Sequence, residues 1–385
     1  MQHYDYIMAG GGMAALSLSY QIIEWNPAAS ILIVDPERKG ENDRTWSYWA
    51  ADPQPFDAIA SASWRTVRLN GDGWSTSIDI APYVYRMIRS VDFYDTVLSR
   101  LERAPHVAFH RADVTVIEDG AESALIECGD GSTWVGDWVF DSRFDPAEYA
   151  ERTGPYHYLK QHFLGWTIEA DRPVFDPDAI TMFDFRTPHH NEMRFVYVLP
   201  SSTTRALVEF TLFSATLLDD QEYVAALSTY IGDVLGIESY RVVERERGVI
   251  PMTDEPARRR AGRRILAIGT RGGRVKPSTG YAFRRTQADS LAIVASLRDT
   301  GHPFAIPAAK PRFALLDTMM LQVMHRSGER SQEVFSRLFA RNPVDRLFRF
   351  LDEEVTLAEM LAVMATVPWA PFIRAFVRTR LFGKV

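Results

Sequence analysis

The first 35 residues place a glycine-rich turn between an apolar strand and a helix. Residues 6–9 are apolar and predict a short buried strand, and residues 14–25 have the composition of a helix. Residues 31–35 form a second apolar run that ends in an acid. A strand, a helix and a second strand within about 30 residues are typical of a βαβ unit. The chain is therefore expected to contain a parallel sheet and to belong to the α/β class.

The turn itself predicts a dinucleotide site. Gly10, Gly12 and Ala15 occupy the fixed positions of the G-x-G-x-x-G/A motif. The first permits the tight turn, the second lets the backbone approach a pyrophosphate, and the third lets the helix pack closely on the strand. Asp35 ends the second strand, where a carboxylate can bind ribose hydroxyls. Glycine turns occur in many α/β proteins, but the strand, the helix and the terminal acid together favour a dinucleotide.

Composition limits the class of protein. With 385 residues, of which 46% are hydrophobic and 24% charged, the chain is a folded globular protein of about two domains. A formal net charge of −7 argues against a nucleic-acid partner, and the single cysteine, Cys128, fits a reducing cytoplasm. The chain enters a strand at once, which leaves no room for a signal peptide. Because no uncharged apolar run reaches the ~18 residues of a spanning helix, we expect a protein that is soluble or lies on a membrane.

The character of the sequence changes along the chain. Residues 155–250 are rich in aromatic and β-branched residues and predict antiparallel strands. An apolar run at 265–268 then resumes the first domain, and the pattern is helical from residue 303. The predicted boundaries are 1–150 and 256–302 for a cofactor domain, 151–255 for an inserted β-sheet substrate domain and 303–385 for a helical C-terminal region.

A second glycine-rich element distinguishes between the common dinucleotides. Gly272 and Gly273 lie between the run at 265–268 and a helix-like segment at 285–297. Backbone N–H groups at such a turn can approach a bound anion at the positive end of the helix dipole. Short β-like runs between residues 107 and 140 also interrupt the regular βα wind of an NAD domain. This layout is typical of FAD enzymes, so the predicted fold is a Rossmann-like FAD-binding domain of the aromatic-hydroxylase type with an inserted, mainly antiparallel sheet.

Three charged segments have less specific interpretations. Arg89 precedes a predicted helix, where it meets either the phosphates of the cofactor or an acid at the surface. His189–His190 lies in a predicted turn, and no metal site is expected there. We interpret the acids at 352–354 as surface residues that stabilise the start of the next helix.

A single carboxyl group stands within an apolar strand. In the run 206–213, alternation places Glu209 on the same face as Leu207, and both faces of the run are mostly apolar. Glu209 is therefore predicted to point into a hydrophobic space, where its neutral form is favoured and it can donate a proton near neutral pH. The alternative is a Glu on an edge strand, paired with Arg194 or Arg205.

Several separate segments carry a resemblance that extends along the whole chain. They are 43–46 (DRTW), 85–94 (YRMIRSVDFY), 161–166 (QHFLGW), 276–281 (KPSTGY) and 350–354 (FLDEE). These segments resemble signatures of the FAD-dependent lycopene cyclases of carotenoid synthesis.

The strand around Glu209 resembles the Leu-Glu-Glu-Thr motif of that family, whose first acid is held to be the proton donor. That acid falls on Glu209. The chain departs from the pattern at two positions, because the second motif acid is Phe210, and Thr270 replaces an Asp that many FAD proteins carry after the late strand. We expect the contact at Thr270 to be weaker, or to come from backbone N–H groups.

The resemblance implies a lycopene β-cyclase, an isomerase that acts on the acyclic ψ-ends of lycopene without net redox change. In such an enzyme Glu209 protonates the terminal double bond, and a tertiary carbocation forms. The neighbouring double bond then closes a six-membered ring, and proton loss gives the β-ionone ring of γ- and β-carotene. The resemblance also implies reduced FAD, kept reduced by NAD(P)H or another donor, as a source of negative charge beside the cation.

A substrate pocket follows from the same resemblance. Its candidate residues are Phe163, Trp166, Phe210 and Tyr281, whose aromatic faces can stabilise a cation. Packing in the core is the alternative role for each of them. The segment from Lys276 to Tyr281 is expected to form a wall between flavin and polyene, which places Lys276 in the pocket as well.

The C-terminal residues 372–385 combine cations with apolar residues. They contain Arg374, Arg378, Arg380 and Lys384 and no acid. A basic amphipathic helix can lie in an anionic membrane surface; the alternative is a terminal helix that packs on the body. Because lycopene resides in the bilayer, we expect a cytoplasmic protein peripherally associated with the inner face of the cell membrane. Other enzymes of carotenoid synthesis are candidate partners.

Two other functions remain open from the pattern. An FAD-dependent monooxygenase or reductase acting on a prenyl-type lipid would consume NAD(P)H stoichiometrically, whereas a cyclase only has to keep its flavin reduced. A non-catalytic prenyl-lipid carrier with an FAD-type fold has no need of an isolated carboxyl in an apolar strand. Glu209 therefore favours an enzyme over a carrier.

Overall fold

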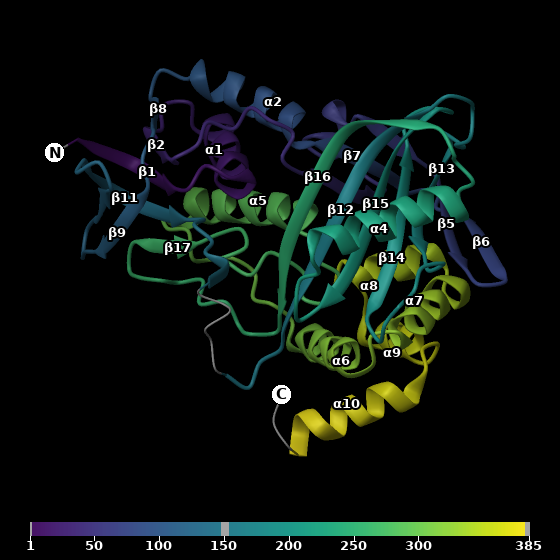
Figure 1. Cartoon of the computed structure of the whole chain (residues 1–385). Helices are drawn as coiled ribbons and strands as arrows, with labels where there is room; N and C mark the ends of the chain where they lie inside the picture. Colours follow the sequence, from purple (N-terminus) through teal and green to yellow (C-terminus); the bar gives the residue numbers. More distant parts are fainter. Residues whose placement is uncertain (1, 148–153, 382–385) are drawn as a thin grey trace.

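The computed structural model describes residues 2–147 and 154–381. Within them the chain forms two large sheets, a small three-stranded sheet and a group of C-terminal helices (Figure 1). The first large sheet and its helices lie on the left in Figure 1, next to the N-terminus. The second large sheet stands beside them, with the C-terminal helices beneath it.

The first sheet contains the predicted βαβ unit. Its order is β8-β2-β1-β11-β10-β9, and β17 also pairs with β11. Its strands are β1 (His3–Ala9), β2 (Ile31–Val34), β8 (Val107–His110), β9 (Val114–Asp119), β10 (Ala124–Cys128), β11 (Thr133–Asp141) and β17 (Ile265–Ala267). β17 runs parallel to β11, so the late strand lies in the same sheet as the N-terminal strands.

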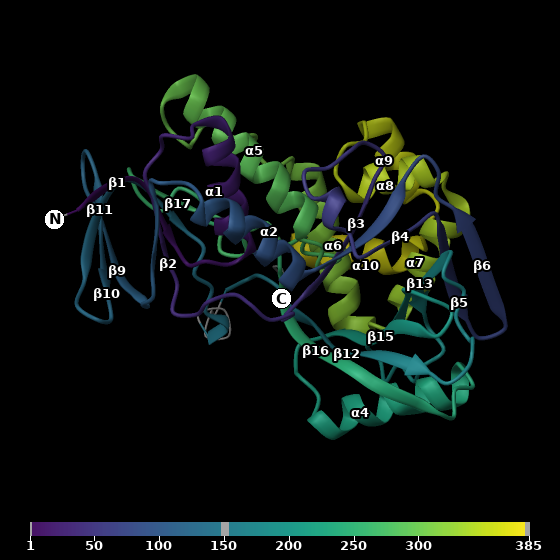
Figure 2. The ribbon, with the colours of Figure 1, turned by 90° about the horizontal axis from the view of Figure 1, so that it is seen from above.

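Helices α1 (Met13–Trp25), α2 (Ser90–Glu102) and α5 (Phe283–Thr300) pack with this sheet. Their apolar positions form one cluster with Met8 and Ile33 of the strands. α1 and α5 are far apart in the sequence but lie side by side (Figure 2). The side-chain amide of Gln287 on α5 donates a hydrogen bond of 2.8 Å to Ser17 on α1. The two glycine-rich turns that precede these helices are thereby brought together.

The second sheet has the order β16-β12-β15-β14-β13-β5-β6. Its strands are β5 (Thr66–Gly71), β6 (Trp74–Asp79), β12 (Tyr158–Ala170), β13 (Ala179–Asp184), β14 (Met193–Pro200), β15 (Arg205–Ser214) and β16 (Tyr240–Thr253). Neighbouring strands are antiparallel except β13 and β5. The hairpin β5–β6 comes from the segment predicted as cofactor domain, so this sheet is not confined to residues 151–255.

A small sheet of order β3-β7-β4 joins the two large ones. Its strands are β3 (Thr45–Ala50), β4 (Ala62–Trp64) and β7 (Val84–Arg89), and a 3₁₀ turn spans Asp57–Ile59. β3 and β7 bring Thr45 and Tyr85 to the second sheet. Ser90 is the first residue of α2, and Arg89 holds the capping position.

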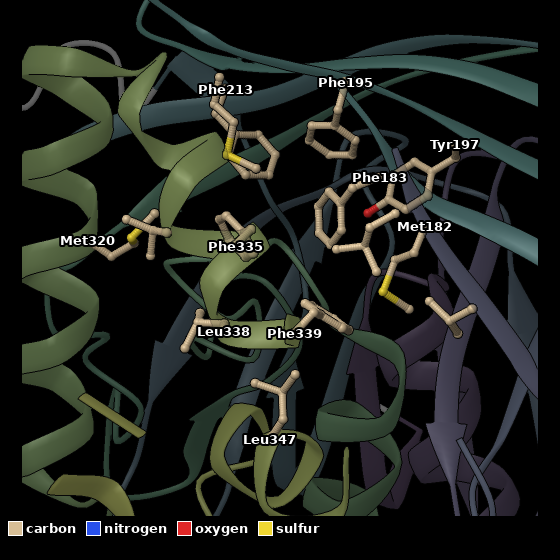
Figure 3. Close-up of a cluster of buried hydrophobic side chains, with 14 of the residues drawn as sticks. Met182, Phe183, Phe195, Tyr197, Phe213, Met320, Phe335, Leu338, Phe339 and Leu347 are labelled. Carbon is tan, nitrogen blue, oxygen red and sulfur yellow. The ribbon is translucent and has the colours of Figure 1, made fainter. Parts of the chain in front are cut away.

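Each face of the second sheet has its own apolar cluster. Helix α4 (Asp220–Thr229) and a π-helical turn (Tyr230–Val234) cover one face. The other face packs against the C-terminal helices, which are α6 (Pro311–Ser327), α7 (Arg330–Arg341), α8 (Val344–Leu351), α9 (Leu357–Met364) and α10 (Trp369–Leu381). Figure 3 shows this second cluster, in which Phe183 of the sheet lies 5.1 Å from Phe335 of α7 between ring centroids.

The alternation predicted for residues 206–213 is present in β15. Leu207 and Phe213 belong to the cluster of the C-terminal helices, whereas Val208 and Phe210 belong to the cluster beneath α4. Glu209 therefore lies on the face of the sheet that is turned away from α4.

Candidate functional site

The turn between β1 and α1 is shaped to receive an anion. Gly10 has a φ of +97°, and a Cβ there would lie 2.5 Å from Oγ of Ser142. At Gly12, by contrast, no described atom lies within 4 Å of the position that a Cβ would take. The first turn of α1 has the apolar side chains of Met13 and Ala14, so its N–H groups remain available. Ala15 is fully buried, as close packing of helix on strand requires.

Asp35 stands beside this turn at the end of β2. Its Oδ2 accepts a hydrogen bond of 2.6 Å from the backbone N–H of Gly11, and its Oδ1 accepts one of 2.9 Å from Glu37. Lys39 lies 3.5 Å from the same carboxylate. A neighbouring cavity of about 300 Å³ is lined by Asp35 and Leu98. The carboxylate is thus fixed at the edge of a space where it can accept hydrogen bonds from ribose hydroxyls.

A larger cavity of about 400 Å³ runs from the start of α1 to the second sheet. Gly12 lines one end of it, and Leu207 and Glu209 line the other. Between these ends the wall is formed by Gly269 and by the segment 279–283. The cavity therefore joins the glycine-rich turn before α1 to the buried carboxyl of Glu209.

Gly272 and Gly273 do not line this cavity, contrary to the sequence prediction. A Cβ at Gly272 would lie 2.5 Å from the carbonyl oxygen of Ala267, so this glycine permits close packing on β17. Gly273 has a φ of +69° and lines an adjoining cavity of about 930 Å³, which shares Thr270, Arg274 and Val275 with the first. Gly269 and Thr270 are the residues of this turn that line the cavity reaching Glu209, together with Arg274 and Val275 just beyond it.

Glu209 is buried and its carboxyl group accepts a hydrogen bond of 2.9 Å from the hydroxyl of Thr211. Burial, followed by the charge of Glu246 and a hydrogen bond with it, raises the pKa of Glu209 well above its usual range. The Thr211 hydrogen bond opposes this shift. Arg194 pairs with Glu192 at 2.6 Å, and Arg205 is exposed at the start of β15. The arrangement is that of a neutral carboxylic acid, not of an edge-strand ion pair.

Glu246 on β16 is a second acid of this site that the sequence did not reveal. Glu209 and Glu246 are both register partners of Gly165 on β12, one from each side. Glu246 is buried and accepts a hydrogen bond from the hydroxyl of Thr45. In the sequence, Glu246 lies in the charge-rich run 244–247 and resembles part of a solvated face. The residues of β16 around Glu246 alternate between buried and exposed positions. Only this alternation could have identified Glu246 as a buried residue among its charged neighbours.

Three tyrosines face the same end of the cavity. Tyr197 is the register partner of Glu209 on β14, and the hydroxyl groups of Tyr85 and Tyr281 lie 3.0 Å apart. Burial raises the pKa of each tyrosine well above its usual range, so all three are neutral. Tyr281 and Phe163 line the cavity as the sequence predicts.

Trp166 and Phe210, by contrast, lie outside the cavity. Both belong to the cluster beneath α4, with Tyr223 and Leu227, on the opposite face of the sheet from Glu209. They take the alternative role of core packing because residues an odd number of positions from Gly165 or Glu209 on a strand point to the other face.

Lys276 is held in an ion-pair cluster. Its ammonium group lies 3.0 Å from Asp317 on α6 and 2.9 Å from Glu353, which follows α8. Arg285 pairs with the same Glu353 at 2.8 Å. The neighbouring Asp352 accepts a hydrogen bond of 2.9 Å from the indole of Trp49. The acids at 352–354 therefore do not stabilise a helix start; they fasten the segment after β17 to the C-terminal helices.

Arg89 makes an ion pair of 2.7 Å with Glu244 on β16. The sequence left two roles open for Arg89, contact with cofactor phosphates or pairing with an acid, and the structure shows the pairing with an acid. The pair ties β7 to the second sheet next to Glu246.

Comparison with known proteins gives the family. Residues 5–377 match the family model described as lycopene cyclase protein. The chain belongs to the lycopene cyclase family. Over 322 residues it is 27% identical to the lycopene beta cyclase of Arabidopsis thaliana, covering 78% of this chain and 62% of that protein. It is 28% identical to the lycopene beta cyclase of Capsicum annuum, covering 74% and 58%. The chain spans about three fifths of the length of these relatives.

Solved structures confirm the fold of this family member. HpxO of Klebsiella pneumoniae, complexed with FAD, superposes with a TM-score of 0.64 at 17% identity, covering 96% of this chain and all of that one (100%). A geranylgeranyl bacteriochlorophyll reductase-like protein from Thermoplasma acidophilum gives 0.62 at 12% identity, covering 98% and 99%. The fold is that of the aromatic-hydroxylase type, as the sequence predicts.

The ion-pair cluster around Lys276 allows a test of its structural role. We expect Lys276→Met to lower the free energy of unfolding by about 3–5 kcal/mol, because Asp317 and Glu353 would lose their shared buried cation. Urea denaturation measures this change. Arg241→Met, which removes an exposed ion pair with Glu169, should change it by no more than about 1 kcal/mol. An unchanged unfolding free energy in Lys276→Met would contradict the structural role.

Proposed function

We propose that this lycopene cyclase family member is a lycopene β-cyclase, which converts the ψ-ends of lycopene to β-ionone rings with no net redox change. The observation that carries the proposal is the neutral, buried carboxyl of Glu209 at one end of a cavity whose other end is a dinucleotide-type turn. Such a carboxyl can protonate an alkene that water cannot reach. The names of the plant relatives support lycopene as the substrate.

Glu209 is the proton donor in this proposal. The proton moves from its carboxyl group to the terminal double bond, and the electron pair of the neighbouring double bond closes the ring on the resulting tertiary cation. Tyr85, Tyr197 and Tyr281 surround this end of the cavity with neutral aromatic rings, whose faces attract a cation. Leu199 and Leu207 line the same end and exclude the water that would trap the cation as an alcohol.

FAD is the proposed cofactor, and the residues present fit it. The open cradle at Gly12 and the N–H groups of α1 suit a pyrophosphate, Asp35 suits the ribose, and Gly269 and Thr270 line the path toward Glu209. In its reduced, anionic form the flavin supplies negative charge near a developing cation. NAD(P)H or another donor keeps it reduced in this proposal.

The cradle at Gly12 gives a test of FAD binding. Gly12→Val should fold, because φ at this position is −76°, which any residue adopts. Its side chain would occupy the space next to the α1 N–H groups, so we expect FAD to bind about tenfold or more weakly. Flavin fluorescence titration measures the affinity, and Gly40→Val, also in open space, is the matched control. Unchanged FAD affinity in Gly12→Val would place the pyrophosphate elsewhere.

The role of Glu209 gives the test of the reaction. Purified protein is incubated anaerobically with lycopene in liposomes and photoreduced FAD, and the products are separated by chromatography with mass detection. We expect a cyclic product of unchanged mass. In Glu209→Gln, which keeps the shape but cannot donate the proton, the rate should fall at least about a hundredfold.

Glu169→Gln is the matched control for this test, since Glu169 is an exposed acid on the adjacent strand β12. It should retain the wild-type rate. An oxygenated or reduced product from the wild type would support the monooxygenase or reductase instead. Lipid that binds but stays unchanged would support the carrier.

The membrane surface is the proposed partner of helices α9 and α10. Large apolar residues are exposed on both helices, namely Leu357, Leu361, Trp369, Ile373, Phe376 and Val377. Phe372 and Ala375 pack α10 on the body, while Arg374 and Arg378 are exposed beside the apolar residues. An apolar patch flanked by cations suits an anionic lipid surface. Of the predicted tail, Lys384 lies outside the described residues.

Helix α10 lies at the edge of the molecule in Figure 1, where it can reach a surface. Within residues 2–147 and 154–381, no single helix is long and apolar enough to cross a membrane. A bent pair of helices, Leu357–Met364 and Trp369–Arg378 at 115°, reaches that length and composition when the two are taken together. The apolar patch on α9 and α10 and the cations beside it support the proposed localisation, which is peripheral attachment to the inner face of the cell membrane.

The attachment can be tested with vesicles. The double variant Trp369→Asp, Ile373→Asp should sediment several-fold less with vesicles of anionic lipid, because it places acids in the patch. Val224→Asp with Leu291→Asp, two exposed apolar residues on α4 and α5, is the control and should bind as the wild type does. Equal sedimentation of both double variants would rule out α10 as the attachment site.

A further inference from the structure

We propose that Glu246 is a positioning residue that acts through Glu209. The two acids form a carboxyl pair that shares one proton. Glu209 donates this proton to the substrate, and the pair regains a proton after ring closure. This inference rests on the proposed function of Glu209 as proton donor. It adds a second acid, from a different strand, to the same site.

The register of three strands brings the two carboxyl groups together. Glu209 on β15 and Glu246 on β16 flank Gly165 on β12, so their backbones are about 10 Å apart across two strand spacings. The side chains can meet only by leaning over the strand between them. Gly165 leaves this space open, because a Cβ there would lie 2.9 Å from Cγ and 3.2 Å from Oε1 of Glu246.

The hydrogen bonds of Glu246 show where a proton is needed. Its Oε2 accepts from the hydroxyl of Thr45. Its Oε1 is buried, and no donor group of the described residues reaches it as long as both acids are ionised. The large majority of buried side-chain oxygens in proteins have a hydrogen-bond partner. A proton on Glu209 provides that donor, and a hydrogen bond between the two carboxyl groups then satisfies both.

The surroundings favour one shared proton over two charges. Two adjacent carboxylates cannot both ionise easily, and burial strengthens this effect. The groups that face Glu209 are Glu246, Thr211 and the neutral Tyr85, Tyr197 and Tyr281. The cations that line the same cavity are Lys39, Arg44 and Arg274. Burial and then the charge of Glu246 hold the pKa of Glu209 up, which keeps its acid form available at neutral pH.

The proton balance of the reaction closes within the pair. One proton leaves Glu209 and forms a C–H bond at the terminal alkene. The neighbouring π pair forms the C–C bond of the ring. One proton then leaves a ring carbon as its C–H pair becomes the new double bond, and the carboxyl pair takes up that proton. The pair thus begins and ends each turnover with one proton.

The sign of the pH dependence follows. The acid form of Glu209 is the active form, so activity is lost as pH rises through its raised pKa. Glu246→Gln keeps the size of the side chain but removes the charge that holds this pKa up. We expect the alkaline limb of the activity profile to move to lower pH by about one unit or more. In the control Glu169→Gln the limb should stay in place.

A spectroscopic titration makes the test independent of turnover. The carbonyl stretch of a protonated acid, assigned by its loss in Glu209→Gln, is followed by infrared difference spectroscopy across pH. In Glu246→Gln this band should disappear at lower pH than in the wild type. An unmoved band would overturn the pair even if Glu209→Gln is inactive. Cyclisation by Glu209→Gln at the wild-type rate would instead overturn the proposed function.

Gly165→Ala separates the two acids without removing either. Its methyl group would occupy the space into which Glu246 leans, so the band of Glu209 should again titrate at lower pH. Gly232→Ala, where the added Cβ meets open space, is the matched control. Flavin content and urea denaturation establish that each variant is folded. A wild-type titration in folded Gly165→Ala would contradict contact between the two acids over this glycine.

Discussion

The burial of one carboxyl group in the second sheet sets the conditions for the rest of the site. An ionised carboxylate at the position of Glu209 would carry a large desolvation cost, so the group stays neutral and hydrogen-bonded. Water must be kept from the face of the sheet on which Glu209 lies for this to hold. The C-terminal helices pack on that face, while helix α4 covers the other, so the layered architecture contributes to the burial of Glu209.

The same architecture assembles the cavity from distant parts of the sequence. The segment after β17 begins at the cofactor end with Gly269 and Thr270 and reaches the sheet with Tyr281. Lys276 lies in the middle of this segment and is fastened by Asp317 and Glu353 from the C-terminal helices. The helices that cover the sheet therefore also fix the distance between Gly269 and Thr270 at one end of the cavity and Glu209 at the other.

Local patterns in the sequence predicted the features that depend on neighbours in the chain. The βαβ unit and the burial of Glu209 follow from glycine spacing, apolar runs and alternation. Features that depend on strand pairing were missed or misplaced. Glu246 is paired with Gly165 across 81 positions of sequence, and Lys276 finds its partners only after α6 and α8 have packed. The prediction that Trp166 and Phe210 line the pocket rests on their aromatic side chains. Alternation along residues 206–213 already places Phe210 on the face opposite Glu209.

The position of Phe210 in the sheet explains why this chain can depart from the family pattern there. The second acid of the Leu-Glu-Glu-Thr motif follows the first directly, so in a strand it points to the opposite side of the sheet. In this chain that side is the apolar cluster beneath α4, where Phe210 is fully buried and an acid would lack a partner. An acid next to Glu209 in sequence is thus remote from the cavity, whereas Glu246, two strands away, faces it. The partner of a strand residue is found across the sheet, so Phe210 in place of the second motif acid leaves the surroundings of Glu209 in the cavity unchanged.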